Sequence, residues 1–271
     1  MSSQTDFKFF ISSAFRQIGT LLRLTFVQII RRKAIFFYFS LLGFFLLGEW
    51  TCTTSAGGET SHGVSSSMYF ILTSFWSLVF LVILTSDLLR QDMDAQVHTL
   101  WLSRPVDPYA YVGSKGLALL ICVVLFVLLA FGISSSFSLE IPWEFLWYQG
   151  TMMLVYSFFV LLVLLVTLFS NQSLAIVSSL GLLLFSCILD FVAYNQNIDM
   201  SADASDVKKF ALKTIYWVLP QVGTVFYHSY ALFSAKVDPK NFYGPYSFVQ
   251  VGAWIVILKS TLWLSTRHKE I

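Results

Sequence analysis

Six long apolar runs dominate this sequence, at about 34–50, 68–86, 116–139, 146–170, 173–194 and 246–265. A helix needs roughly 17–25 mostly apolar residues to cross the hydrocarbon core of a bilayer. Each run has that length or nearly so, the first being shortened at its outer end by Glu49. We therefore predict an all-α integral membrane protein with six transmembrane helices over residues 34–271, preceded by a separate segment at 1–33.

The low charge content supports this prediction. Only 12% of the 271 residues are charged, whereas soluble globular proteins carry about 25%. This composition excludes a disordered chain and a nucleic-acid-binding domain, so we expect no nucleic acid partner. Three scattered cysteines also exclude a disulfide-stapled scaffold.

The basic residues predict the orientation in the membrane. Six of the 17 Lys and Arg residues precede the first run, and the loop at 51–67 has none. Because basic residues favour the cytoplasmic side, both termini should be cytoplasmic, in a multi-pass protein of the cell (inner or plasma) membrane. The segment 195–245, expected outside, carries five lysines, but long segments cross largely regardless of charge.

The first 33 residues are typical of an amphipathic helix. Apolar residues recur from Phe7 to Leu22 at helical spacing, and the basic positions of the segment include Arg16, Arg23, Arg31 and Arg32. Such an elbow helix is suited to lying in the cytoplasmic interface against membrane lipid. The alternative is a soluble helix packed on a neighbouring domain.

The segment 195–245 contains a further apolar stretch that Pro220 divides. Since proline ends or kinks a helix, we expect two short helices that dip into the outer leaflet or lie across it. A seventh full span is the rival interpretation. Within the spans, the ionisable side chains of Asp190 and Lys259 are expected to reach toward an interface.

Sequence patterns of common enzymes and metal sites do not occur. The chain has no GxxxxGK[ST], HExxH or GxSxG, and its His, Cys and acidic residues match no metal-ligand spacing. We therefore expect neither an enzyme nor a resident metal or cofactor.

The loop between the second and third runs, residues 87–115, is the most specific feature. It carries Asp92 and Asp94 near its start, continues through an apolar stretch at 97–102, turns at Arg104-Pro105 and ends at Lys115. An amphipathic helix lying across the cytoplasmic face in this way could transmit force. A simple connector helix is the alternative.

This loop resembles the signature of ABC-2 type permeases. In that family an acidic stretch leads to Gly-Thr, a leucine-rich helix, a turn similar to Ser103-Arg104-Pro105-Val106, and a closing lysine. Here Asp92 and Asp94 fall on the acidic positions, and Lys115 follows Pro105 by ten residues. The departures are Gln96-Val97 in place of Gly-Thr, and Ser114 between the final Gly and Lys.

The resemblance implies a single-domain permease with a type V exporter-like architecture, working in export as a dimer with a second copy or a homologue. ATP and Mg would be bound by a separate cytoplasmic ATP-binding-cassette subunit, which docks on the coupling loop. Leu100 or Trp101 would be the apolar anchor, and Asp92, Asp94 and Arg104 rim charges. The other coupling positions implied are His98, Pro105 and Lys115. A secondary transporter and a membrane scaffold or assembly factor remain as alternatives.

Overall fold

All regular structure in the described part of the chain is helical. The computed structural model describes residues 3–32, 35–36, 40, 66–94, 108–136, 143–195, 214–234 and 246–268. Its principal helices are α1 (Ser3–Ile30), α3 (Ser66–Asp94), α5 (Pro108–Ser136), α6 (Glu144–Phe169), α7 (Gln172–Asn195), α9 (Val222–Ser234) and α10 (Tyr246–His268).

Five helical segments are long and apolar enough to cross a membrane. They are Ile71–Met93, Pro108–Gly132, Phe145–Phe169, Gln172–Asp190 and Tyr246–Arg267. The predicted all-α class is thus confirmed for the described residues, and the five long apolar helices support the predicted multi-pass membrane protein. The predicted span at 34–50 lies outside the described residues, apart from 35, 36 and 40.

The outward faces of the long helices are apolar. On α5 a stripe of large side chains at helical spacing stays exposed: Leu117, Ile121, Val124, Leu125, Leu128 and Leu129. Exposed apolar side chains recur on α7 and α10, for example Phe185 and Val256. Contiguous exposed apolar surface of this extent is rare on soluble monomers. It fits helices that face lipid.

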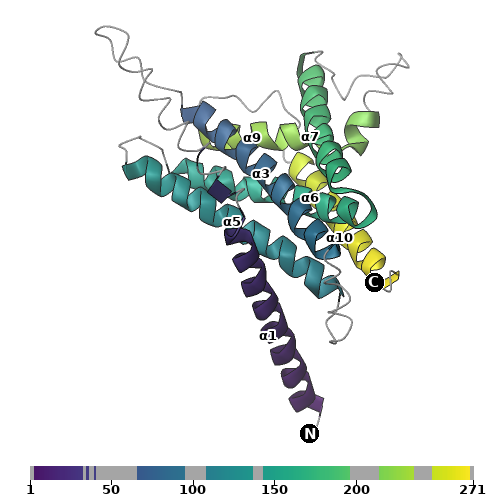
Figure 1. Cartoon of the computed structure of the whole chain (residues 1–271). Helices are drawn as coiled ribbons and strands as arrows, with labels where there is room; N and C mark the ends of the chain where they lie inside the picture. The colour runs from purple at the N-terminus through teal and green to yellow at the C-terminus, as the bar shows by residue number, and fades with distance from the viewer. Residues whose placement is uncertain are drawn as a thin grey trace.

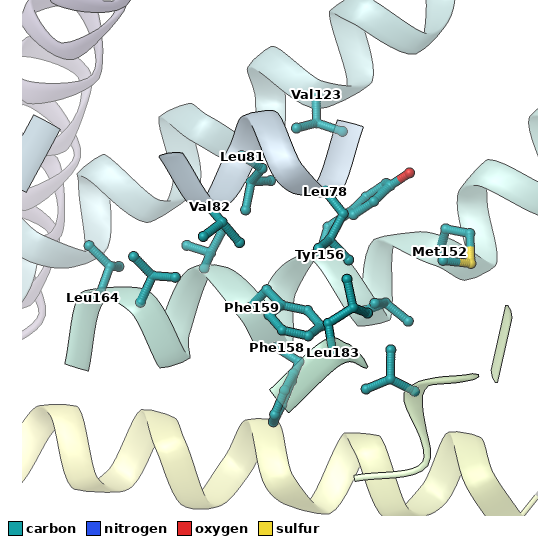
Figure 2. Close-up of a cluster of buried hydrophobic side chains, with 14 of the residues drawn as sticks. Leu78, Leu81, Val82, Val123, Met152, Tyr156, Phe158, Phe159, Leu164 and Leu183 are labelled. Carbon is teal, nitrogen blue, oxygen red and sulfur yellow. The ribbon is translucent and has the colours of Figure 1, made fainter. Parts of the chain in front are cut away.

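Helix α6 forms the centre of the bundle and packs against α3, α5, α7, α9 and α10. Most of its described side chains are buried or half-buried, as expected for a helix that is apolar nearly all round. Figure 2 shows Tyr156 and Phe159 of α6 packed toward Leu78 and Val82 of α3.

A second apolar cluster joins α1 to the bundle. Ile29 of α1 packs there with Leu84 and Leu88 of α3 and with Leu119 and Phe126 of α5. The described residues of α1 that take part in this cluster, Leu22, Phe26 and Ile29, lie in its C-terminal part, and in Figure 1 the N-terminal end of α1 extends away from the other helices. The location of α1 in the membrane interface stays a prediction.

Helices α3 and α5 extend further toward each other in the sequence than predicted, which corrects the limits 87–115 given to the coupling loop. Helix α3 continues to Asp94 and α5 begins at Pro108, so only 95–107 separates the two helices. A hydropathy pattern ends the second span before its first charge, Asp87. Charged residues are nevertheless accommodated in these helical turns, because Asp87 and Asp92 each pair with a basic side chain from another part of the chain.

Helical structure is interrupted at Pro220, where the sequence predicts a break between two short helices. Residues 214–218 are helical, 219–221 are not, and α9 follows. Val222 and Val225 of α9 are fully buried in the central cluster. Helix α9 is therefore embedded among the long helices and does not lie outside them.

Candidate functional site at the junction of α3 and α5

Three side chains meet where α3 ends and α5 begins. The Lys115 ammonium and the Tyr111 hydroxyl of α5 both donate to Oδ2 of Asp92 on α3. Lys115 Nζ also donates to the carbonyl oxygen of Leu88, at 3.1 Å, and lies 5.0 Å from the centre of the Tyr111 ring. We call Asp92, Tyr111 and Lys115 the clamp.

Helical spacing explains how these groups come together. Leu88 and Asp92 are four residues apart on α3, and Tyr111 and Lys115 are four apart on α5, so each pair shares one helix face. The neighbouring Gly116 lets α5 approach α6 closely, because a Cβ there would lie 3.2 Å from side-chain atoms of the facing helix. Small residues at helix contacts commonly permit such an approach in membranes.

The clamp residues that carry charge are buried. Lys115 is 1% exposed and Asp92 8%. An isolated charge in such surroundings would be strongly unfavourable, so each ion depends on the other and on the additional hydrogen bonds. The clamp therefore fixes the C-terminal end of α3 relative to the first turns of α5.

A second ion pair ties α3 to the residues that follow α1. Arg32 Nη1 donates to Asp87 Oδ2 at 2.8 Å, and Gln91 Nε2 donates to Asp87 Oδ1 at 3.3 Å. This pair is partly exposed, with side-chain accessibilities of 19% and 27%. The last two turns of α3 thus contact both α5 and the residues that follow α1 through charged groups.

Two of the predicted coupling residues, Asp92 and Lys115, are brought together by the fold. The expectation that Asp92 is a rim charge facing a partner is corrected, because its carboxylate is buried in the clamp. The lysine that ends the family-like pattern neutralises the acidic residue that begins it.

The remaining predicted coupling positions have no described side chains. Asp94 is the last residue of α3, with its side chain outside the described part. His98, Leu100, Trp101, Arg104 and Pro105 lie in 95–107, outside the described residues.

The four arginines of the predicted elbow helix differ in exposure and pairing. Arg23 and Arg31 are exposed, whereas Arg32 is paired with Asp87. Arg16 lies in α1, with its side chain outside the described part.

Sequence reasoning missed Tyr111 and Asp87. Tyr111 could have been found from its spacing, since a residue four positions before Lys115 on a helix lies on the same face. Asp87 had no comparable signal, because Arg32 is 55 residues away. Among the described residues, no group of three or more His, Cys, Asp or Glu side chains could hold a metal ion.

Comparisons with known proteins add no assignment. No model of a known protein family matches the sequence, and no curated protein matches it.

Proposed function

We propose that this chain is the permease subunit of an ABC-2 type transporter, acting in export beside a second permease and driven by separate ATP-binding subunits. In this proposal the clamp end of α3 and α5 faces the cytoplasm. The 95–107 segment is the element that contacts the ATP-binding subunit.

The clamp is the observation that carries the proposal. The acidic residue and the lysine that bracket the family-like pattern, Asp92 and Lys115, bind each other although they are 23 positions apart in the sequence. A loop whose two ends are fixed by a buried ion pair can pass a displacement to α3 and α5. An unconstrained connector would absorb the same displacement. An allosteric effect of this kind requires that the nucleotide-bound partner favour one arrangement of the helices.

A secondary transporter is the second candidate, and the break at Pro220 is the observation that favours it. Such transporters place broken helices and buried charges at their substrate sites. Here, however, the N-terminus of α9 is already occupied by the carboxylate of Asp190 from the same chain. These groups, which could otherwise bind an anionic substrate, have an internal partner, and we favour the permease.

The identity of the partner separates these functions. The tagged full-length chain is purified in mild detergent from the membranes that naturally contain it, and bound proteins are identified by mass spectrometry. We expect a stoichiometric protein with a P-loop, and ATP hydrolysis by the purified complex. Purification of the chain without any ATP-binding protein, also after cross-linking in intact membranes, would refute the permease assignment.

A further inference from the structure

The backbone at the Pro220 break has several polar groups without helical partners. Proline has no N–H, and the turn over 219–221 interrupts the regular series of helical hydrogen bonds. Three local backbone bonds remain, from Leu219 N to Ile215 O at 3.0 Å, from Val222 N to Pro220 O at 2.9 Å and from Val225 N to Gln221 O at 3.1 Å. Unsatisfied backbone groups are costly inside a membrane, so the neighbouring helices must supply the other partners.

Helix α10 satisfies one side of the break. The Gln250 side-chain amide donates to the carbonyl oxygens of Trp217 and Leu219 and accepts from Gln221 N at 3.2 Å. Trp254 Nε1, one turn further along α10, donates to Val218 O at 3.2 Å. Three successive carbonyl groups before the proline are thus held by α10.

Helix α7 satisfies the other side. Ser186 Oγ donates to Pro220 O at 2.8 Å and accepts from Val222 N at 3.1 Å, so one hydroxyl bridges the break. Asp190 accepts from Thr224 N at 2.7 Å and from Thr224 Oγ1 at 2.9 Å. The expectation that Asp190 reaches toward an interface is therefore wrong, since its carboxylate caps the N-terminus of α9. Lys259, by contrast, is exposed on α10.

Gly223 makes this cap possible. A Cβ at position 223 would collide with Oδ2 of Asp190 and lie 3.3 Å from the Cα of Cys187. Any side chain at this position would push the carboxylate away from the amides at the start of α9.

We propose that residues 217–224, together with Ser186, Asp190, Gln250 and Trp254, form a latch that joins α7 to α10. In Figure 1 the C-terminal end of α7, α9 and the N-terminal end of α10 lie in the upper part of the molecule, and the clamp end of α3 and α5 at the lower right. The latch goes beyond the proposed function and does not depend on it. Closed, it holds α9 among α6, α7 and α10; released, it lets α9 move as a unit while the long helices stay folded.

Hydrogen bonds suit such a device because they have discrete made and broken states. Asp190 and Gln250 hold the break from opposite sides and are positioning residues. Weakening the hydrogen bonds of either residue should raise the population of the released state without unfolding the bundle. A merely structural contact would instead loosen all neighbouring helices together.

Two buried hydroxyl residues allow the two cases to be separated. Ser229 of α9 and Thr266 in the last turn of α10 are both buried and are not latch residues. Each is replaced by cysteine, one at a time, in the full-length chain in lipid nanodiscs, with Cys52, Cys122 and Cys187 replaced by serine. The rate of modification by N-ethylmaleimide then reports local opening at α9 or at α10.

The latch variants are Asp190→Asn, Gln250→Leu and Thr224→Val, and Thr224→Ser is the matched control because it keeps both donors. We expect each latch variant to speed modification of the Ser229→Cys reporter by about tenfold or more, as expected when hydrogen bonds that stabilise the closed state are lost. The Thr266→Cys reporter should change by less than about twofold, because α10 stays in place and this position lies far from α9 along the helix. Thr224→Ser should leave both rates unchanged.

Two results would contradict the latch proposal. Equal acceleration at both reporters would mean general loosening of the bundle, and unchanged rates at Ser229→Cys in all latch variants would mean that these bonds control no opening. If Asp190→Asn does not fold, Thr224→Val decides by the same comparison, because it removes only one hydroxyl.

Discussion

Lys115 of α5 and Asp92 of α3 form a buried ion pair across the two ends of the 95–107 segment. The pair lies at one end of the bundle, and the carboxylate also accepts from Tyr111. Removing one member of a buried pair leaves an uncompensated charge, whereas replacing both by apolar residues removes that charge altogether. The stability of the chain should therefore respond very differently to single and double substitutions here.

Lys115→Met and Asp92→Asn should each lower the free energy of unfolding by about 3–5 kcal/mol. The double variant Asp92→Leu, Lys115→Met should recover most of that loss, since no charge stays buried. Reversible unfolding in mixed detergent micelles, followed by circular dichroism, measures the difference. A double variant no more stable than the single variants would contradict the geometry of the clamp. Arg32→Gln should cost only about 0.2–1 kcal/mol, because its pair with Asp87 is partly exposed.

Two glycines three residues apart on α5 test how closely that helix approaches α6. A methyl group added at Gly113 meets nothing within 4 Å, whereas one at Gly116 lies 3.2 Å from Val160 and Leu164. Gly113→Ala should stabilise by up to about 1 kcal/mol through helix propensity. Gly116→Leu should destabilise by about 1–3 kcal/mol through overpacking. Thermal unfolding of the two variants measures this contrast, and equal effects would mean that α5 and α6 are not in close contact.

The membrane orientation predicted from the basic residues can be tested with single cysteines. A membrane-impermeant thiol reagent applied to intact cells should label Ser61→Cys and Asp203→Cys, and should label Ser265→Cys only after the membrane is opened. The physical reason is the concentration of Lys and Arg at the two ends of the chain. Labelling of Ser265→Cys but not Ser61→Cys in intact cells would reverse the orientation.

The sequence is informative where a local pattern determines the structure. Apolar length locates five of the long helices, and Pro220 locates the break before α9. These features depend on consecutive residues, so no knowledge of distant contacts is needed.

Features that depend on pairing across the bundle are not predictable in this way. A hydropathy pattern ends a predicted span at its first charged residue, so it misses the helix limits at Asp94 and Pro108. In the folded chain these charges are paired, Asp87 with Arg32 and Asp92 with Lys115, and the helices continue past them. The sequence also predicts the wrong surroundings for the Asp190 side chain, for a related reason. Its partners include the backbone amide of Thr224, and because every residue except proline has such an amide, the sequence does not indicate this contact.

The coupling role of the 95–107 segment is the central claim, and retention of the ATP-binding protein tests it most directly. Full-length variants are compared at matched membrane levels for the amount of the co-purifying ATP-binding-cassette protein and its ATP hydrolysis. The double variant Leu100→Ala, Trp101→Ala should lose either the ATP-binding partner or the stimulation of its ATP hydrolysis. The reason is that a buried aromatic anchor contributes about 2 kcal/mol or more to binding, which is about thirtyfold in Kd. Asp94→Ala, the removal of a rim charge, should retain the partner at nearly the wild-type level. Wild-type retention and wild-type ATP hydrolysis in the Leu100→Ala, Trp101→Ala double variant would contradict the account and leave the segment as a connector.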